Sequence, residues 1–357
     1  MTAVHRWLGL TAGLLLVVIG LSGAALVFRE EIDRALNPHL LRVAPSSMRA
    51  PVQGALQAAV DVVTRAYPGE QPTRIRMPRT PDGTLEVWLG SEPSRYAYVD
   101  PNRDTLLGAR RPTEFLTGVL FLVHTKLLAG EAGHLAAGAC GLVLALLGVS
   151  GLVVWWPGRG RLRAATTVAW RGSRKRVIYD LHRSVGFYAS GFLVLAGVTG
   201  ASLVFPEAFQ GAIYRALRDP AGLPAPRATS PETRPSLPLD RLVAVAERAQ
   251  PGGTISYLYL PLRPHDPFRV RQRLAPELHP NGKSFVHLDP RTGAVLAVED
   301  GAAAPSGARA YSALYPLHIG AVGGVSTRVL AVVVGLTPTL FFVTGLAMWR
   351  GRRRRQA

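Results

Sequence analysis

Long apolar stretches alternate with polar segments along this chain. Four stretches contain no charged side chain and no histidine, and they cover residues 7–28, 135–158, 184–205 and 329–349. Each is long enough to cross a hydrocarbon core about 30 Å thick as a helix that rises about 1.5 Å per residue. Because backbone groups in lipid must find their hydrogen bonds within the segment, such stretches are expected to be helices. The pattern predicts an integral membrane protein with four spans.

The first apolar stretch could also be read as a secretory signal peptide. Its apolar run is longer than the usual core of such a peptide, and no clear A-x-A cleavage site lies before the polar residues that follow it. We therefore expect this stretch to remain in the protein as a membrane anchor.

Positive charge sets the expected orientation. The chain carries 41 Lys and Arg against 23 Asp and Glu, a formal net charge of +18. Arg and Lys crowd the loop 159–183 and the tail 350–357, and short loops rich in these residues stay in the cytoplasm. Both termini are then cytoplasmic, and the long segments 29–133 and 207–328 lie outside, since long segments translocate largely regardless of charge. Beside a membrane helix, the basic tail is expected to contact anionic lipid rather than nucleic acid.

The chain is an internal duplication. The first and third apolar stretches match without a gap at a spacing of 177 positions, which carries His5 to His182. The second and fourth match at a spacing of 194 positions, which carries His124 to His318. Because each half contains two spans, both halves enter the membrane in the same direction, and the repeat is parallel rather than inverted. We expect an all-α, four-helix transmembrane bundle built from two equivalent halves.

The two outer segments have the same predicted content. Each begins with a helix-like run, 52–67 or 239–250, and continues with three runs in which apolar, β-branched and aromatic residues alternate with polar ones, as in strands. These six runs are 73–78, 84–90, 95–101, 254–261, 267–274 and 284–290. A Pro- and Ser-rich stretch at 219–238 reads as an extended linker. We expect a small α+β module in each outer segment.

The predicted order of parts follows from these patterns. It is a helix at 1–28, an outer module at 29–133, a helix at 134–158, a cytoplasmic loop at 159–183, a helix at 184–206, an outer module at 207–328, a helix at 329–349 and a tail at 350–357.

Four of the nine histidines are matched by the duplication, and the topology sorts them by membrane face. His5 and His182 lie at the cytoplasmic ends of the first and third spans, whereas His124 and His318 precede the second and fourth spans on the outer side. His5 and His124 lie on opposite faces, on the order of 30 Å apart, so pairing within one half is excluded. We expect His5 to pair with His182, and His124 with His318.

Three uses of such pairs compete. A Zn or Cu site wants three or four protein ligands, and the single cysteine, Cys140, lies inside a span. A proton relay is expected to place ionisable groups through the membrane interior, where these spans have none. Haem iron accepts two axial imidazoles from facing helices of a bundle. The sequence therefore favours two haems, one near each face, with iron bound by His5 and His182 and by His124 and His318.

Other residues near these histidines have two interpretations each. The matched glycines of the first and third spans leave space either for a macrocycle or for a neighbouring helix; they are Gly9, Gly20, Gly23, Gly186, Gly197 and Gly200. His134 starts the second span and is matched by Arg328 in the other half, so it is a further candidate ligand or a propionate contact.

The quoted motifs resemble a known family. The segments "HRWLGL" at 5–10, "LHRSVGF" at 181–187, "FLVHTKLLAG" at 121–130, "YPLHIGAVGG" at 315–324 and "SGLVVWWPGRGR" at 150–161 are similar to those of the PepSY-associated transmembrane family. The resemblance implies PepSY-like outer modules, a bacterial inner-membrane location, and two b-type haems that pass electrons to a periplasmic ferric chelate such as a ferric siderophore. Iron would leave the chelate as the more weakly bound ferrous ion.

Two functions of different classes follow, with a third close to the first. The leading expectation is a haem-dependent oxidoreductase of the ferric-chelate reductase type, for which no catalytic side chain is assigned. No nucleotide-binding fingerprint is present, so electrons must come from a separate cytoplasmic reductase or from membrane quinol. The alternatives are a non-enzymatic, membrane-anchored PepSY module that regulates a periplasmic partner, and a haem-bearing membrane subunit of another oxidoreductase.

Overall fold

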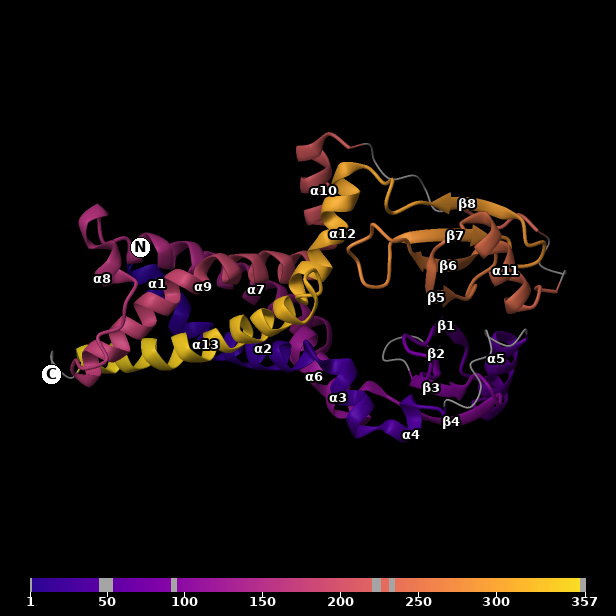
Figure 1. Cartoon of the computed structure of the whole chain (residues 1–357), viewed down its shortest axis with the longest axis horizontal. Helices are drawn as coiled ribbons and strands as arrows, with labels where there is room; N and C mark the ends of the chain where they lie inside the picture. Colours follow the sequence, from indigo (N-terminus) through magenta and orange to yellow (C-terminus); the bar gives the residue numbers. More distant parts are fainter. Residues whose placement is uncertain (1, 45–53, 91–94, 220–225, 231–234, 354–357) are drawn as a thin grey trace. The chain divides into compact units, whose positions relative to one another are not determined.

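The computed structural model describes residues 2–44, 54–90, 95–219, 226–230 and 235–353. The chain forms two compact units (Figure 1). The helical unit comprises Met1–Arg29, Leu120–Gly211 and Leu314–Ala357, and the sheet unit comprises Glu30–Val119 and Ala212–Ala313. Each unit therefore draws on both halves of the duplicated sequence.

Three helices of the helical unit are long and apolar enough to cross a membrane. They are α7 (Gly130–Trp155), α9 (Arg174–Val204) and α13 (Gly324–Arg353). A fourth span is available if α1 (Thr2–Thr11) and α2 (Gly13–Leu26) are taken together, although they are bent by 62°. The described residues thus provide three spans, or four with the bent pair.

The bend corrects the expectation of one straight helix through 1–28. It falls at Ala12, between α1 and α2. The Thr11 hydroxyl donates a 2.8 Å hydrogen bond back to the carbonyl of Trp7, a local bond that commonly bends helices. Beyond the bend, a Cβ on Gly13 would lie 2.4 Å from the Phe342 ring, so the first turn of α2 packs closely on α13. Apolar length alone carries no sign of such a break.

The spans pack in pairs through matched glycines. Helix α7 packs against α9 and α2 against α13, and α9 also contacts α13. A Cβ on Gly141 would lie 2.9 Å from the carbonyl oxygen of Gly197, and a Cβ on Gly20 would lie 2.5 Å from that of Gly335. These distances are too short for any side chain, so the four glycines let two helix backbones touch. For Gly20 and Gly197, helix packing is therefore the role seen in the structure.

Shorter elements connect the spans. Helix α9 begins well before the expected residue 184, because the Ser173 side chain caps it by accepting a hydrogen bond from the backbone N–H of Arg176. The remaining short elements are α3 (Arg29–Leu36), α4 (Pro38–Leu41), η1 (Pro112–Glu114), α6 (Leu116–Lys126), η2 (Arg159–Arg161), α8 (Leu162–Ala165), α10 (Pro206–Leu217) and α12 (Ser306–His318). The tail is described only to residue 353.

One antiparallel sheet of eight strands runs through the sheet unit, in the order β4-β3-β2-β1-β5-β6-β7-β8. Its strands are β1 (Pro72–Arg76), β2 (Leu85–Leu89), β3 (Arg95–Asp100), β4 (Thr105–Arg110), β5 (Thr254–Tyr259), β6 (Phe268–Arg273), β7 (Ser284–Leu288) and β8 (Val295–Glu299). All six predicted strands are present, and β4 and β8 at the two edges were not predicted.

The two expected modules are joined in this one sheet rather than standing apart. Strand β1 of the first half pairs with β5 of the second, with Ile75 opposite Leu258. Each four-stranded half would otherwise leave this strand as an edge with unpaired backbone groups, and joining the halves removes both edges. The two outer segments, each expected to form an α+β module, thus share one sheet.

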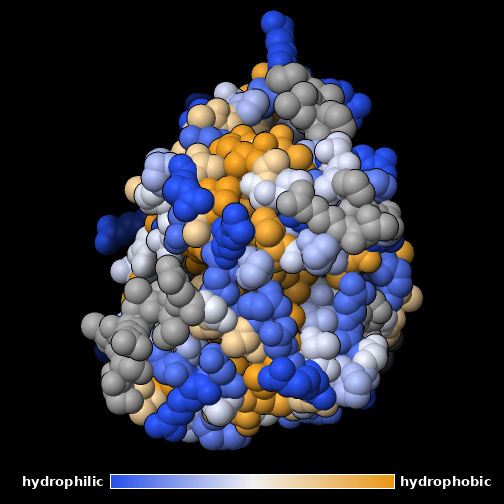
Figure 2. Space-filling model, turned by 90° about the vertical axis from the view of Figure 1, so that its right-hand side faces the viewer, coloured by the Kyte–Doolittle hydropathy of each residue, from blue (hydrophilic) through white to orange (hydrophobic). Residues whose placement is uncertain are grey.

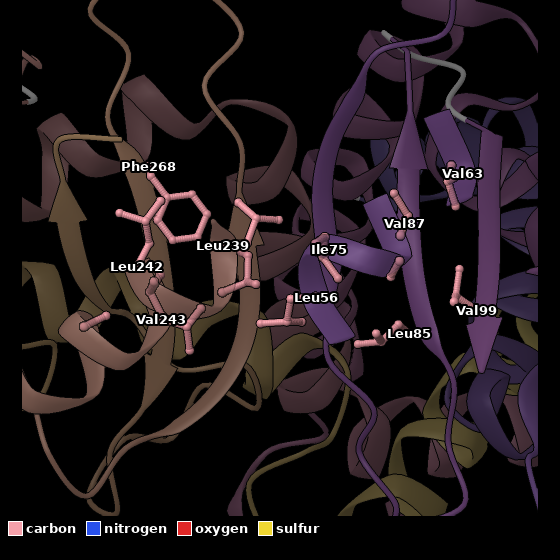
Figure 3. Packing of buried hydrophobic residues seen from close by; sticks show 14 of the residues in the cluster. Leu56, Val63, Ile75, Leu85, Val87, Val99, Leu239, Leu242, Val243 and Phe268 are labelled. Atoms are coloured by element: carbon pink, nitrogen blue, oxygen red, sulfur yellow. The ribbon is translucent and has the colours of Figure 1, made fainter. Parts of the chain in front are cut away.

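A single hydrophobic core underlies one face of the sheet. Helices α5 (Ala55–Ala66) and α11 (Leu239–Ala249) cover this face, and side chains from both halves form one cluster with the strands (Figure 3). The Asp240 carboxylate of α11 accepts hydrogen bonds from the backbone N–H groups of Leu56 and Gln57, at the start of α5. Each half thus satisfies groups of the other, and the sheet unit needs both.

The surface of the sheet unit is polar at the end seen in Figure 2, where hydrophilic side chains surround smaller hydrophobic areas. The predicted linker 219–238 lies partly outside the described residues. In its described part, the Ser230 hydroxyl donates a 2.7 Å hydrogen bond to the buried Asp289 carboxylate. This contact ties the segment before α11 to the turn between β7 and β8.

Candidate histidine-pair sites

The inner histidine pair joins four helices. His5 of α1 and His182 of α9 have ring centroids 6.4 Å apart, with the ring planes at 87°. His5 Nδ1 lies 3.0 Å from the Ser150 hydroxyl of α7, and His182 Nδ1 lies 2.7 Å from the Thr344 hydroxyl of α13. Each imidazole is therefore held by a helix other than the one that carries it.

The outer histidine pair has the same construction. His124 of α6 and His318 of α12 have ring centroids 6.0 Å apart, with the ring planes at 40°. His124 Nδ1 lies 2.9 Å from the backbone carbonyl of Ile19 in α2. His318 Nδ1 lies 3.0 Å from the Thr199 hydroxyl in α9. The structure thus brings together the histidines that the duplication matches.

The hydrogen bonds fix the tautomer of all four imidazoles. A carbonyl oxygen only accepts, so His124 must carry its proton on Nδ1. The hydroxyls of Ser150, Thr199 and Thr344 each donate to a carbonyl three or four residues earlier in their own helix, and so they accept from the facing Nδ1–H. Nε2 is left with a lone pair, and no Nε2 of these four has a hydrogen-bond partner in the described part of the chain. This is the arrangement of a metal-binding histidine.

The supporting groups of the inner pair follow the same duplication as the histidines. Ser150 and Thr344 are separated by 194 positions, the spacing that relates α7 to α13. At the outer pair the acceptors differ, because His124 bonds the Ile19 carbonyl and His318 the Thr199 hydroxyl. The supporting contacts were therefore duplicated with the histidines at the inner pair and diverge at the outer one.

Glycines lie against the imidazoles. A Cβ on Gly23 would lie 2.7 Å from Cε1 of His124, and one on Gly200 would lie 3.0 Å from Cε1 of His318. At the inner pair the matching distances are 3.3 Å from Gly151 to His5 and 3.8 Å from Gly345 to His182. No side chain fits at Gly23 without moving the ring, so these positions clear space for the outer imidazoles.

Gly9 and Gly186 have a different environment. They follow His5 and His182 by one helical turn and share the same helix face. The nearest atom to a Cβ built on either lies 3.9 Å away, at Leu147 for Gly9 and at Phe341 for Gly186. These two glycines are not needed for helix contact, and they leave a smooth surface beside the inner imidazoles.

The ring spacing suits one metal ion between two imidazoles. A coordinating nitrogen lies about 2 Å from the metal, and about 1.1 Å from the centroid of its own ring by covalent geometry. Two imidazoles on opposite sides of one ion thus place their centroids about 6.2 Å apart, against the observed 6.4 and 6.0 Å. Within the described residues, no group of three or more His, Cys, Asp or Glu side chains is placed to hold a metal ion. Each pair therefore brings together two imidazoles and no third side chain of these types in the described residues.

One continuous helix connects the two pairs. Helix α9 carries His182 of the inner pair, and Thr199 in the same helix contacts His318 of the outer pair. Seventeen residues of continuous helix separate them, which corresponds to about 26 Å of rise. A hydrocarbon core is about 30 Å thick.

The remaining histidines do not join these pairs. His134 Nδ1 donates a 3.1 Å hydrogen bond to the carbonyl of Thr125, and His134 has no ring contact with another histidine in the described residues. His265 bonds the carbonyl of Ala228, and His287 lies 2.8 Å from Glu299 in the sheet unit. Burial and the charges of neighbouring Arg and Lys side chains lower the pKa of His279 to about 3.

Sequence reasoning missed the groups that orient the imidazoles. Ser150, Thr199 and Thr344 are small hydroxyl residues within apolar spans, and nothing in their local sequence sets them apart. The spacing of 194 positions between Ser150 and Thr344 was the available signal, because it equals the spacing of His124 and His318.

Comparison with known proteins identifies the chain. No curated protein matches it in sequence. The family model described as "PepSY-associated TM region" matches residues 2–352, which is nearly the whole chain and includes both histidine pairs and both halves of the sheet. Together with the apolar helices, this match establishes a membrane protein in contact with the lipid bilayer. The chain belongs to the PepSY-associated transmembrane family.

Proposed function

We propose that the protein carries electrons across the membrane through two b-type haems, one at each histidine pair, to a periplasmic Fe(III) acceptor. The observation that carries the proposal is the two imidazole pairs, spaced for one metal ion each and separated by about 26 Å of helix α9. The ferric siderophores are the acceptor class that fits, because iron leaves such a chelate on one-electron reduction to Fe(II).

The donor set suits haem better than a bare metal ion. Each site offers two neutral imidazoles and no thiolate or carboxylate, whereas a structural Zn site needs four protein ligands. A porphyrin brings the four equatorial nitrogens that the protein lacks, and the glycine surfaces at Gly9 and Gly186 allow a flat ring to approach. When bound, haem supplies an Fe(III)/Fe(II) couple that accepts and returns one electron at a time.

The chain's own residues set the conditions for that couple. The Nδ1–H groups of the four histidines donate to Ser150, Thr344, Ile19 and Thr199, which fixes each ring and increases the basicity of its Nε2. The apolar helices around them exclude water and keep the local dielectric low. Electrons enter from a cytoplasmic reductase or from quinol, and both chain termini lie in the cytoplasm of a bacterium whose inner membrane holds the protein.

The optical spectrum tests this proposal. Protein purified from haem-replete cells is expected to be red, with a Soret band that shifts on reduction with dithionite, and to bind two haems per chain. His5→Ala and His318→Ala should each lose about half of the haem, since each removes one of the two imidazoles that would hold one haem. His134→Ala is the matched control, because His134 lies near the outer pair but bonds only a backbone carbonyl. Full haem content in both ligand variants would refute the assignment.

Reoxidation kinetics separate the acceptor from the alternatives. Dithionite-reduced protein mixed with a ferric siderophore should return to its oxidised spectrum and release Fe(II), which a ferrous chelator detects. A red protein that ferric chelates do not reoxidise would instead be a haem-bearing subunit of another oxidoreductase. A colourless protein would point to a membrane-anchored binding module.

A further inference from the structure

The sheet of the sheet unit has one face that helices α5 and α11 do not cover. Strand residues alternate between faces, so the neighbours of the buried Ile75, Val87, Leu258 and Val270 point to the opposite side. This second face carries arginines and aromatic rings instead of aliphatic side chains, with Glu86 and the buried Tyr98 among them.

These side chains form a row in register across six adjacent strands. The ladder places Tyr96 opposite Trp88, Trp88 opposite Arg74, Arg74 opposite Tyr259, Tyr259 opposite Arg269, and Arg269 opposite His287. Directly cross-strand positions are about 5 Å apart, so each side chain in this row touches the next. We name the six residues the arginine–aromatic row.

Ring and cation–π contacts connect the row from Tyr96 to Arg269. Trp88 and Tyr96 have centroids 4.8 Å apart, and the Arg74 guanidinium lies 4.3 Å from the Trp88 centroid and 5.5 Å from that of Tyr259. On the far side of Tyr259, the Arg269 guanidinium lies 4.8 Å from the same ring. Two cations thus flank one tyrosine, in the middle of a surface made of aromatic faces.

The two arginines of the row lack the ion pairs that their neighbours have. Arg76, next to Arg74 on β1, pairs with Glu30 and lies 3.8 Å from Glu86. Arg74 Nε is buried without a hydrogen-bond partner, and within the described residues neither Arg74 nor Arg269 has a carboxylate at ion-pair distance. Glu299 interacts with Arg269 electrostatically, and its carboxylate lies 2.8 Å from His287. A buried donor left unsatisfied is costly, so an anion that accepts from Arg74 is favoured here.

The neighbouring strands add positive potential. Arg271 lies directly opposite Tyr257 in the β5–β6 ladder. Its guanidinium donates to the carbonyl of Gly282, an uncharged acceptor that leaves the positive charge uncompensated. Burial, followed by the positive charge of Arg271, lowers the pKa of Lys283, and Arg271, Lys283, Arg79 and Arg273 all lower that of His279. Several cations thus gather around this end of β6 and β7, beside the carboxylate of Glu277.

The chemistry of the row selects its ligand. Guanidinium groups bind oxyanions through charge-assisted hydrogen bonds, and they stack on flat rings. The faces of Trp88, Tyr96 and Tyr259 stack on aryl groups. A ligand with anionic oxygens on aromatic rings satisfies both, whereas a neutral chelate without rings satisfies neither.

We infer that the arginine–aromatic row is the binding surface for an anionic, aryl-bearing Fe(III) chelate of the catecholate class, in preference to a neutral hydroxamate chelate. This assignment names the acceptor class and rests on the proposed function for the ligand's role as electron acceptor. Binding itself depends only on the row.

A redox-inert probe tests the binding separately from electron transfer. Gallium(III) tris-catecholate has the charge and shape of the ferric complex but accepts no electron, and gallium(III) tris-hydroxamate is its neutral counterpart. With the full-length protein in lipid nanodiscs, isothermal titration calorimetry should detect the catecholate complex and no comparable binding of the hydroxamate complex. Raising the salt concentration should weaken the catecholate binding.

Variants locate the site. Arg74→Gln and Arg269→Gln should each weaken catecholate binding about tenfold, since each removes a charged donor. Arg65→Gln is the matched control, because it removes the same charge from the exposed side of α5 on the other face of the sheet, and it should bind as the wild type does. Arg269 is exposed, so its replacement leaves the core untouched.

The outcomes separate the two proposals. Absence of catecholate binding, equal binding of both gallium complexes, or unchanged binding in both arginine variants would overturn this inference even in a red, dihaem protein. A colourless protein that binds the catecholate complex through Arg74 and Arg269 would refute the proposed electron transfer while leaving the surface assignment intact.

Discussion

Replacing Gly23 with alanine is expected to weaken the outer histidine site selectively. The new Cβ would lie 2.7 Å from Cε1 and 3.0 Å from Nδ1 of His124, well inside van der Waals contact. The His124 ring cannot simply move away, because its Nδ1–H is bonded at 2.9 Å to the carbonyl of Ile19, which lies one turn before Gly23 in α2. The substitution therefore either costs this hydrogen bond or turns Nε2 away from His318.

The size of the effect follows from the contact distances. Overpacking a tight site costs about 1–3 kcal/mol, which corresponds to about a 5- to 150-fold loss in affinity for whatever the outer pair binds. Alanine is intrinsically the better helix former by about 0.5–1 kcal/mol, so α2 itself should persist. Gly345→Ala is the comparator, since its Cβ would lie 3.8 Å from Cε1 of His182, an ordinary contact.

Haem content and potentiometry measure the outcome. Under the proposed function, Gly23→Ala should lose the haem component that His318→Ala also removes, while Gly345→Ala should keep both components. Gly200→Ala and Gly151→Ala, at 3.0 and 3.3 Å, should fall between them in that order. A Gly23→Ala protein with full occupancy and unchanged potentials, or an equal loss in Gly345→Ala, would show that the glycine clearance does not serve the imidazoles.

Three further predictions address the supporting groups and the sheet unit. Thr344→Val removes the hydroxyl that accepts from His182, so it should weaken haem binding at the inner pair about 10- to 100-fold. It should also raise the midpoint potential of the inner haem in a redox titration. Thr337→Val is the control in the same helix, because the Thr337 hydroxyl bonds only its own backbone, and it should change neither quantity. Leu258→Ala, at a fully buried position on β5, should destabilise the sheet unit by about 2–5 kcal/mol in urea unfolding, and an unchanged midpoint would refute the shared core. The pKa of His279 is lowered from its ordinary value of 6.5 to about 3, so the unfolded state binds more protons than the folded state between these two pH values. The free energy of unfolding therefore falls as the pH drops below about 6.5, and His279→Gln should remove part of this loss between about pH 7 and about pH 5.

The fold was predictable where a pattern is local. Alternation gave six of the strands, because one face of each is buried in the core. It missed β4 and β8, whose edge positions leave residues such as Val295 and Val298 exposed. It also could not show that β1 pairs with β5, since alternation identifies the buried face of a strand but not its neighbour. The joined sheet follows from backbone pairing between segments that are far apart in sequence.

The candidate site was predictable where the duplication carries it. His5, His182, His124 and His318 stand out because a titratable group recurs beside each span. The hydroxyl partners do not, because serine and threonine are tolerated in any apolar helix by bonding their own backbone, and only packing decides which of them faces an imidazole. The glycines were ambiguous for the same reason. Gly20 and Gly197 touch helix backbones, whereas Gly23 and Gly200 touch imidazoles. Yet Gly23 follows Gly20, and Gly200 follows Gly197, by only three residues.

The duplication also explains how two sites on one plan come to differ. Thr199 accepts from His318, while its matched residue in the first half, Ser22, bonds only carbonyls of its own helix, and His124 donates to the Ile19 carbonyl instead. A carbonyl is the stronger acceptor, so His124 becomes the more basic ligand, whereas both inner histidines face hydroxyls. A more basic axial ligand favours Fe(III) and lowers the potential of its site. Under the proposed function, the outer site is then the stronger reductant, which is what an acceptor holding Fe(III) tightly through hard oxygen ligands requires.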